Sequence, residues 1–179
     1  MNRNVIIIGA GGHSRVIADI IDLSGDSVVG YLDDNVINDS VLGKTSDAHK
    51  FTDCEFIVGI GNNAVRERIM SENPDLPWYT AKHPSATVAK SARVGVGSVI
   101  AAGAVVGVCC TIGRGVIINT SASVDHDSMV GDFCHIAQGA HTGGAVRLGN
   151  CVWLGVGSVV ANGMTLDNYS KTEVGEVIK

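Results

Sequence analysis

Aliphatic residues recur at every sixth position over more than half of the chain. The series runs without a gap from Val88 to Leu166, and Thr142 is its one exception. The residue after each position is often glycine, and the residue two before it is usually alanine, serine or cysteine. A helix or an ordinary sheet cannot keep such a register, because their side chains repeat every 3.6 and every two residues. A six-residue period of this kind predicts a hexapeptide β-helix.

Each hexad of this pattern predicts one short strand and one corner, so three hexads make one triangular coil. The aliphatic residues should point into the prism and stack on their counterparts three hexads away. Asp167 to Lys179 shows no glycine-rich continuation. We therefore expect the repeat to stop at Leu166.

The first eighty residues follow a different pattern, in which short apolar runs alternate with helical spacing. Such alternation predicts βαβ units around an open parallel sheet. The sequence thus divides into a small Rossmann-like domain at 1–82 and a β-helix domain at 83–179, with Pro84 marking the boundary. The expected N-terminal elements are strands at Val5–Ile8, Ser27–Leu32, Glu55–Ile60 and about Trp78–Ala81, a helix carrying Val16, Ile17, Ile20 and Ile21, and a helix at Ala64–Ser71 capped by asparagine.

Composition narrows the choice of partner and compartment. The formal net charge of −5 argues against nucleic acid or an anionic membrane as the main partner, because both favour a basic surface. The N-terminal apolar run is too short for a signal peptide or a spanning helix, so we expect a cytoplasmic chain without membrane insertion. Five cysteines without zinc spacing predict free thiols and no metal site.

A glycine-rich turn follows the first strand, at Gly9 to Gly12. Glycines at a helix N-terminus let phosphate approach the backbone amides. The dinucleotide fingerprint is incomplete, because Ser14 replaces its third glycine and the domain has room for about one mononucleotide-binding half. This disfavours a nicotinamide dehydrogenase and favours a nucleoside diphosphate carrying a small group. His13 should lie beside the expected phosphate site at the helix N-terminus and contact the ligand.

Carboxylates and histidines elsewhere supply further candidates. Asp33 and Asp34 follow the second strand, where they either bind a ribose or base or form a solvated turn. In the β-helix, His126 follows an inward position and points outward between Asp125 and Asp127. A histidine beside a carboxylate is a candidate general base, because the carboxylate fixes the ring tautomer. His135 and His141 precede inward positions and can line the same groove or be outward residues satisfied by water.

These motifs together resemble the bacterial nucleotide-sugar N-acetyltransferases that acetylate UDP-4-amino-sugars, a group that includes the sialic-acid O-acetyltransferase family. The resemblance covers about residues 4–168. It rests on the motifs Gly9-Ala10-Gly11-Gly12-His13, Leu32-Asp33-Asp34, Gly59-Ile60-Gly61-Asn62-Asn63 with a following Arg66, Asn119-Thr120-Ser121 and Asp125-His126-Asp127.

The resemblance implies a left-handed β-helix, a homotrimer with sites between neighbouring subunits, and acetyl-CoA as co-substrate of an N-acetylation for bacterial surface glycan biosynthesis. It implies that His126 is the general base and Asp127 its orienting carboxylate. A backbone N–H of Gly143 or Gly144 is then expected to stabilise the oxyanion. The implied contacts are Gly11, Gly12, His13, Asp33, Asp34, Gly61 and Asn119 for the nucleotide sugar, and His135, Gly144 and Val156 for acetyl-CoA.

Two departures from the family pattern limit the implication. Asp127 is one methylene shorter than the glutamate that often follows the histidine, which leaves its hydrogen bond to the ring open. The end of the repeat at Leu166 removes a coil that normally helps enclose CoA. O-acetylation of a sialic acid or related sugar and a non-catalytic trimeric scaffold therefore stay open as alternatives, and the sequence does not give the sugar or the nucleobase.

Overall fold

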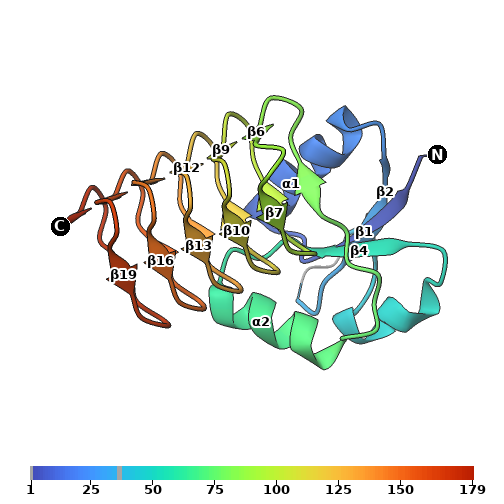
Figure 1. Ribbon diagram of the computed structural model, residues 1–179. Coiled ribbons are helices and arrows are strands. Elements are labelled where there is room, and N and C mark those ends of the chain that lie inside the picture. The colour runs from blue at the N-terminus through green and yellow to red at the C-terminus, as the bar shows by residue number, and fades with distance from the viewer. Residues whose placement is uncertain (1, 36–37) are drawn as a thin grey trace.

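The N-terminal part of the protein is a small parallel sheet with helices. The computed structural model describes residues 2–35 and 38–179 and places this sheet at one end of a long solenoid (Figure 1). The strand order is β3-β2-β1-β4 and all pairs are parallel. Three of the four predicted strands are present as β1, β2 and β4, and β4 ends two residues earlier than expected; the partly buried β3 was not predicted. The strands are β1 (Asn4–Ile8), β2 (Ser27–Leu32), β3 (Val41–Gly43) and β4 (Glu55–Val58).

The helices of this domain are α1 (Gly12–Leu23), α2 (Asn63–Glu72) and the 3-10 helix η1 (Thr45–Lys50). The amphipathic face of α1 buries Ile17, Ile20 and Ile21 as its spacing predicts. α2 begins after Asn62, whose side chain accepts a hydrogen bond from the Val65 amide. The strand predicted near Trp78 is wrong as a strand, because only a single bridge joins Trp78 to Phe56.

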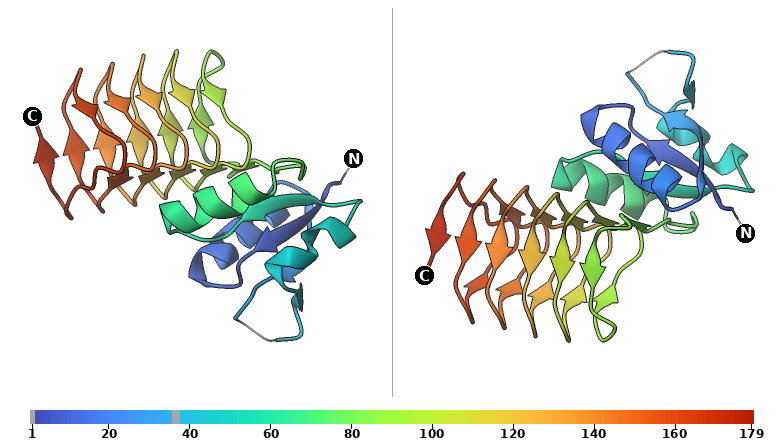
Figure 2. Two further views of the ribbon diagram at one scale, coloured as in Figure 1. Left: turned by 90° about the horizontal axis from the view of Figure 1, so that it is seen from below. Right: turned by 90° about the horizontal axis from the view of Figure 1, so that it is seen from above.

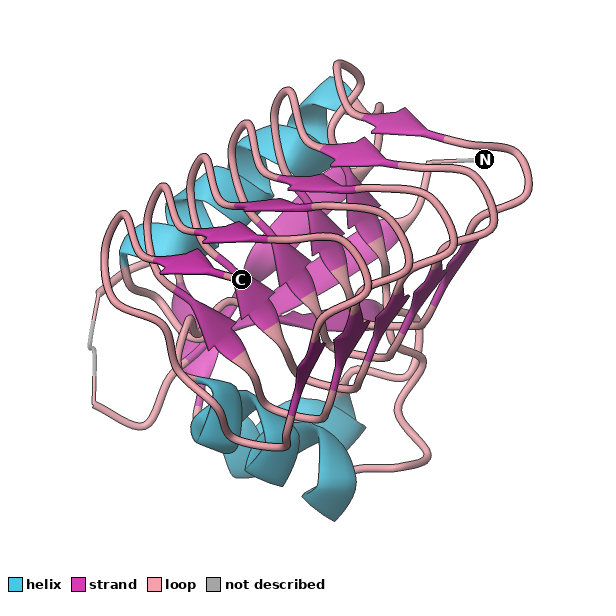
Figure 3. Cartoon of the chain, turned by 60° about the vertical axis from the view of Figure 1, so that its left-hand side comes forward, coloured by secondary structure: helices cyan, strands magenta, loops and turns pink. Residues whose placement is uncertain are grey.

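The C-terminal part is a solenoid of three parallel sheets, one on each side of a triangular prism (Figure 3). Its strands are two residues long and pair with strands three hexads away. We call the sheets the covered face, the valine face and the arginine face. The covered face is β5 (Ala81–Lys82), β8 (Val99–Ile100), β11 (Ile117–Ile118), β14 (His135–Ile136) and β17 (Trp153–Leu154); the valine face is β6 (Thr87–Val88), β9 (Val105–Val106), β12 (Ser123–Val124), β15 (His141–Thr142), β18 (Val159–Val160) and β20 (Val177–Ile178); the arginine face is β7 (Arg93–Val94), β10 (Thr111–Ile112), β13 (Met129–Val130), β16 (Arg147–Leu148) and β19 (Thr165–Leu166).

The sixth-position residues form the core of the prism, as the sequence predicts. Those from Ile100 to Leu166 are buried, and Val88 and Val94 pack against them from the first coil. Thr142 is also buried, and its hydroxyl accepts a hydrogen bond from the Asp125 amide at 3.3 Å. The one polar residue of the series therefore faces inward like the others and is satisfied by the neighbouring corner.

The prediction that the repeat stops at Leu166 is wrong. Lys171 bridges to Trp153, and β20 pairs with β18 at the end of the valine face. The six-residue register continues through the buried Thr172 to Ile178, which packs against the core. This coil does not show up as an aliphatic position because its inward residue is the polar Thr172. The Thr172 hydroxyl accepts a hydrogen bond from the Gly155 amide.

The N-terminal domain packs on the covered face of the solenoid (Figure 2). The outward side chains of Val99 and Ile117 are completely buried and form one hydrophobic cluster with α1, β1 and β4. A second cluster joins Met70 of α2 to Phe133 and Cys151 of the solenoid corners. β5 lies before the expected boundary at residue 83 but pairs with β8 of the covered face. The two domains thus share a continuous apolar seam.

Candidate active site

The glycine turn opens helix α1 and leaves its first amides accessible. Gly11 is the residue before the helix and has no side chain to cap it, and Gly11 and Gly12 are both exposed. The Ser14 hydroxyl is buried and donates to the carbonyl oxygens of Gly9 at 2.7 Å and Gly59 at 3.0 Å. The residue that departs from the dinucleotide fingerprint therefore ties the loops after β1 and β4 together. The turn keeps the open, positive helix end that suits an anion.

The two carboxylates after β2 are held by backbone amides. Asp33 accepts from the amides of Ala10 and Asn35, both at 2.8 Å, and Asp34 accepts from the Thr45 amide at 3.0 Å. A pocket of about 120 Å³ lies between them and helix α2. Its lining includes Gly9, Asp33, Asp34, Asn35, Thr45, Ile60, Val65 and Arg68. The structure thus brings both carboxylates to the carboxyl edge of the sheet, beside the glycine turn.

Beneath this edge, Arg66 is fully buried between the domains. Its guanidinium donates to the backbone oxygens of Ile60, Gly61, Gly115, Phe133 and Cys134 at 2.5 to 3.2 Å and to Asn63 Oδ1 at 3.0 Å. Asn63 in turn donates to the Cys151 and Val152 oxygens. One side chain therefore fastens the loop after β4 to the solenoid.

A polar cluster containing two histidines lies next to Arg66. His135 is 6% exposed, and its Nδ1 lies 3.3 Å from the Gly61 oxygen while its Nε2 lies 3.0 Å from Asn119 Nδ2. Its ring packs 4.3 Å from that of Trp153 and 6.4 Å from that of His13. His13 Nε2 is buried and makes no hydrogen bond to any described residue. We call His13, Gly61, Asn119, His135 and Trp153 the seam cluster.

Burial keeps the seam histidines neutral. Desolvation, together with the positive charge of Arg66, lowers the pKa of His13 to about 4 and that of His135 to about 3. A carbonyl oxygen can only accept, so the Nδ1 of a neutral His135 carries the hydrogen and its Nε2 accepts from Asn119. Neither seam histidine is suited to hold a proton at neutral pH. The sequence left His135 either lining a groove or pointing outward and satisfied by water, whereas in the structure its two nitrogens face Gly61 and Asn119 under the N-terminal domain.

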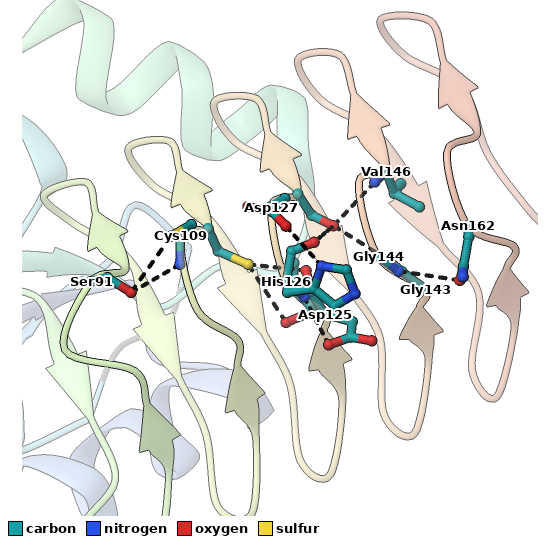
Figure 4. A network of polar contacts seen from close by, with 12 residues as sticks. Ser91, Cys109, Asp125, His126, Asp127, Gly143, Gly144, Val146 and Asn162 are labelled. Carbon is teal, nitrogen blue, oxygen red and sulfur yellow. Dashed lines mark hydrogen bonds and ion pairs between the residues drawn. The ribbon is translucent and has the colours of Figure 1, made fainter.

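His126 lies on the opposite side of the prism, at the corner between β12 and β13 (Figure 4). Its side chain is 52% exposed, and its Nδ1 lies 2.8 Å from Asp127 Oδ2. The shorter carboxylate thus reaches the ring, helped by a left-handed backbone at Asp127 with φ of 59°. Asp127, followed by Asp125, raises the pKa of His126. The carboxylate holds the hydrogen on Nδ1 and leaves Nε2 to accept a proton.

The neighbouring coil is shaped to fit the His126 ring. A Cβ on Gly144 would lie 2.5 Å from Cε1 and Nε2 of His126, so a side chain there would displace the ring from this position. The Gly143 amide donates to Val160 O at 2.8 Å, and the Gly144 amide contacts Asn162 Oδ1 at 3.2 Å. The expected oxyanion role is therefore wrong for Gly143, whose N–H belongs to the sheet ladder. Gly144 N–H is already engaged by a side chain.

The residues predicted for acetyl-CoA do not share one surface of the chain. His135 is in the seam cluster, Gly144 is at the His126 corner, and the exposed Val156 follows β17 at the corner between the covered and valine faces. A pocket of about 690 Å³ does lie beside the seam cluster, between the start of α2 and the last coil. It is lined by Asn62, Asn63, Ala64, Cys151, Trp153, Tyr169, Lys171, Thr172 and Glu173.

The chain therefore presents two separate groups of candidate residues. The glycine turn, Asp33, Asp34 and the seam cluster lie at the N-terminal domain, and His126 with Asp127 and Gly144 lies across the prism. Sequence reasoning missed Trp153 and gave Arg66 no role. The spacing of Trp153 from His135, which equals three hexads, is the signal that would have placed the two rings together on one face.

The cysteines and the possible metal ligands also bear on the chemistry of the site. All five cysteines are free thiols, as predicted. Residues 2–35 and 38–179 contain no group of three His, Cys, Asp or Glu side chains that could hold a metal ion. No helix in this part of the chain is long and apolar enough to cross a membrane.

Comparison with known proteins assigns the chain to a family. The PglD N-terminal domain family matches residues 4–73. The acetyltransferase domain of PglB from Neisseria gonorrhoeae FA1090 superposes with a TM-score of 0.94 at 34% identity, over 99% of this chain and 92% of that chain. The chain belongs to the PglD-like family of nucleotide-sugar N-acetyltransferases. The family predicted from the sequence motifs is thus confirmed.

Other relatives are named for different nucleotide sugars, one linked to UDP and others to GDP. The UDP-N-acetylbacillosamine N-acetyltransferase of Bacillus subtilis (strain 168) is 34% identical over 113 residues, 56% of this chain, and the chain spans about half of that relative's length (52%). The GDP-perosamine N-acetyltransferase of Escherichia coli O157:H7 is 27% identical over 88% of this chain and 78% of its own length. A mutant perosamine N-acetyltransferase from Caulobacter crescentus, in complex with CoA and GDP-perosamine, gives a TM-score of 0.95 at 30% identity over 98% of this chain and 88% of that chain.

Proposed function

We propose that this protein transfers the acetyl group of acetyl-CoA to the amine of a nucleotide-linked 4-amino-sugar, with His126 as general base. The observation that carries the proposal is the His126–Asp127 pair at 2.8 Å, exposed on the solenoid and facing Gly144. Family membership supports the reaction class, and the complex of the Caulobacter crescentus relative with CoA and GDP-perosamine supports the two substrates.

The chemistry is direct transfer between two bound substrates. The amine nitrogen attacks the thioester carbonyl carbon, and its proton passes to Nε2 of His126. The C–S bond then breaks, the electron pair leaves on the CoA sulfur, and the imidazolium returns the proton to give the free thiol. Asp127 supports both steps, because it keeps the hydrogen on Nδ1 and stabilises the imidazolium. Holding amine and thioester together supplies a large part of the rate.

The nucleotide part of the substrate fits the open end of α1. Exposed amides at Gly11 and Gly12 suit the diphosphate, and the pocket between Asp33, Asp34 and helix α2 suits the nucleoside. The seam cluster and the pocket beside Trp153 then lie next to the sugar end. We assign UDP to the nucleotide from the sequence resemblance, and GDP is the alternative that two relatives carry in their names.

A homotrimer would bring the two groups of residues together. The residues proposed for the nucleotide lie in the domain that packs on the covered face, and His126 lies at the far corner, so one chain does not unite the two groups. The valine face exposes Val105, Val159 and Val177 by 41%, 37% and 52% of their surface. Threefold association through this apolar face would place His126 of one subunit against the seam cluster of its neighbour.

The test is release of CoA from acetyl-CoA, followed with a thiol reagent against UDP- and GDP-linked 4-amino-sugars. Sialic acid and an acceptor-free reaction run alongside, and a protein blank corrects for the exposed Cys109. Release with one amino-sugar supports the proposal and names the acceptor. Release only with sialic acid would favour O-acetylation, and no release from a folded protein would favour the scaffold.

A further inference from the structure

Arg66 combines complete burial with a positive charge that no carboxylate neutralises. Its exposed surface is 0%, and its six hydrogen-bond acceptors are all neutral carbonyl or amide oxygens. Within residues 2–35 and 38–179, no Asp or Glu forms an ion pair with it. A buried charge is costly when it lacks a partner of opposite sign. Such an arrangement is retained more readily where something else supplies the negative charge.

The neighbours of Arg66 link it to the loop beside the glycine turn. Two of its donors hold the Ile60 and Gly61 oxygens at 3.1 Å, directly under the loop that faces the glycine turn. The Gly61 oxygen also faces His135 Nδ1, and His13 at the start of α1 lies 6.4 Å from the His135 ring. Both histidines feel the charge of Arg66, since it lowers the pKa of each. The charge of Arg66 therefore acts as far as His13, at the start of α1.

We propose that Arg66 is a positioning residue for the nucleotide sugar: it fixes the Gly61 loop and the His135 tautomer, and its buried charge attracts the substrate diphosphate without touching it. The inference rests on the proposed function, because the anion is the diphosphate of that substrate. The low-dielectric seam lets a charge act over several ångströms, where the same charge at the surface would be screened. The α1 end and Arg66 then act on the same anion from two sides.

The first test needs no ligand and no mutation. Nitrogen NMR of the histidine rings in the wild-type protein distinguishes the two neutral tautomers. We expect His135 to carry its hydrogen on Nδ1 and both His13 and His135 to stay neutral at pH 5. A His135 hydrogen on Nε2, or titration of either ring near the ordinary pKa, would overturn the positioning role whether or not the protein transfers acetyl groups.

The second test separates charge from packing. Arg66→Gln removes the charge and Arg66→Lys keeps it, while Arg93→Gln removes an exposed charge from the arginine face as the matched control. Affinities are measured by calorimetry for UDP and GDP and for the uncharged uridine and guanosine. We expect Arg66→Gln to lower the affinity for the diphosphate by about tenfold or more relative to the affinity for its nucleoside. We expect Arg66→Lys to restore most of that ratio and Arg93→Gln to leave it unchanged.

The outcomes keep this inference apart from the proposed function. An unchanged ratio of diphosphate to nucleoside affinity in folded Arg66→Gln overturns the inference. If that variant does not fold, Arg66→Lys decides: a fall of tenfold or more in its ratio of diphosphate to nucleoside affinity, although the charge is kept, overturns the inference. A wild-type protein that binds UDP or GDP but transfers no acetyl group overturns only the proposed function, and one that binds neither overturns both.

Discussion

The pKa values of two histidines of the same solenoid are shifted in opposite directions because of where the chain places them. His135 lies on the covered face, where burial and Arg66 lower its pKa to about 3. His126 lies at an exposed corner, where Asp127 raises its pKa. The repeat supplies the same rigid backbone to both, so the difference comes from what covers each position. The exposed histidine beside its carboxylate is the one suited to proton transfer, and the covered one is a neutral hydrogen-bonding element.

The largest effect is expected from removing the exposed histidine, His126. His126→Ala should lower kcat by about 10² to 10⁴, the usual contribution of a general base, while substrate affinity stays within a few-fold. Single-turnover kinetics and nucleotide-sugar calorimetry measure the two quantities. His49→Ala, which removes an exposed histidine of the N-terminal domain, is the control. Equal turnover in His126→Ala and wild type would remove His126 from the mechanism.

A change at the glycine turn should affect binding instead of chemistry. Gly12→Asp has room, because the nearest atom to the new Cβ is Arg15 Nη2 at 3.9 Å, and a carboxylate at a helix N-terminus stabilises the helix. The same carboxylate repels a diphosphate. We expect KM for the nucleotide sugar to rise by about tenfold or more, with the melting temperature unchanged or higher. Gly12→Ala is the control, and equal effects of the two variants would argue against a phosphate site here.

The fit of the His126 ring against the next coil predicts a smaller loss. Gly144→Ala pushes a methyl group against Cε1 and Nε2, so the ring must rotate while the coil stays folded. We expect kcat to fall by about tenfold, a typical result of slight misplacement of a catalytic group. The double variant with His126→Ala should lose no more than His126→Ala alone. Additive losses would show that Gly144 acts on the reaction by another route.

The smallest expected change is a shift of the pH profile. A general base works when deprotonated, so a raised pKa delays activity until higher pH. Asp127→Asn removes the main cause of that rise and should move the acidic limb of kcat to lower pH. Its plateau should also fall, because the ring loses its orienting acceptor. An acidic limb at the same pH in both proteins would mean that it reports another group.

The sequence predicted the solenoid better than the seam, for a physical reason. The inward positions from Ile100 to Leu166 are set by a local repeat, so their register can be followed without tertiary information. The last coil was missed because Thr172 satisfies its hydroxyl within the solenoid and breaks the aliphatic series. The burial of His135 depends on a domain more than seventy residues away, since its partner there is Gly61. No local pattern shows such a contact.

The candidate site divides in the same way. His126 and Asp127 could be identified from adjacent residue types, and their hydrogen bond depends on the backbone of one corner. The role of Arg66 could not be identified, because its acceptors are backbone oxygens from separate loops and coils, which have no side-chain signature. The grouping of His135, Gly144 and Val156 around one CoA stays a prediction, because the three residues lie at different places on one chain and the resemblance puts the site between subunits.

The central claim is that the covered side of one subunit works with the exposed corner of another. Mixing two impaired variants, at nucleotide-sugar concentrations far below KM, tests it: His126→Ala lacks the base but keeps an intact nucleotide site, and Gly12→Asp binds the nucleotide sugar weakly but keeps an intact base. After the two are unfolded and refolded together, we expect acetyl transfer to recover to about a quarter of the wild-type rate per site, the share of neighbouring pairs with both intact parts in a random threefold ring. Mixed assemblies that form, as mass spectrometry would show, but recover no activity would contradict a site shared between subunits.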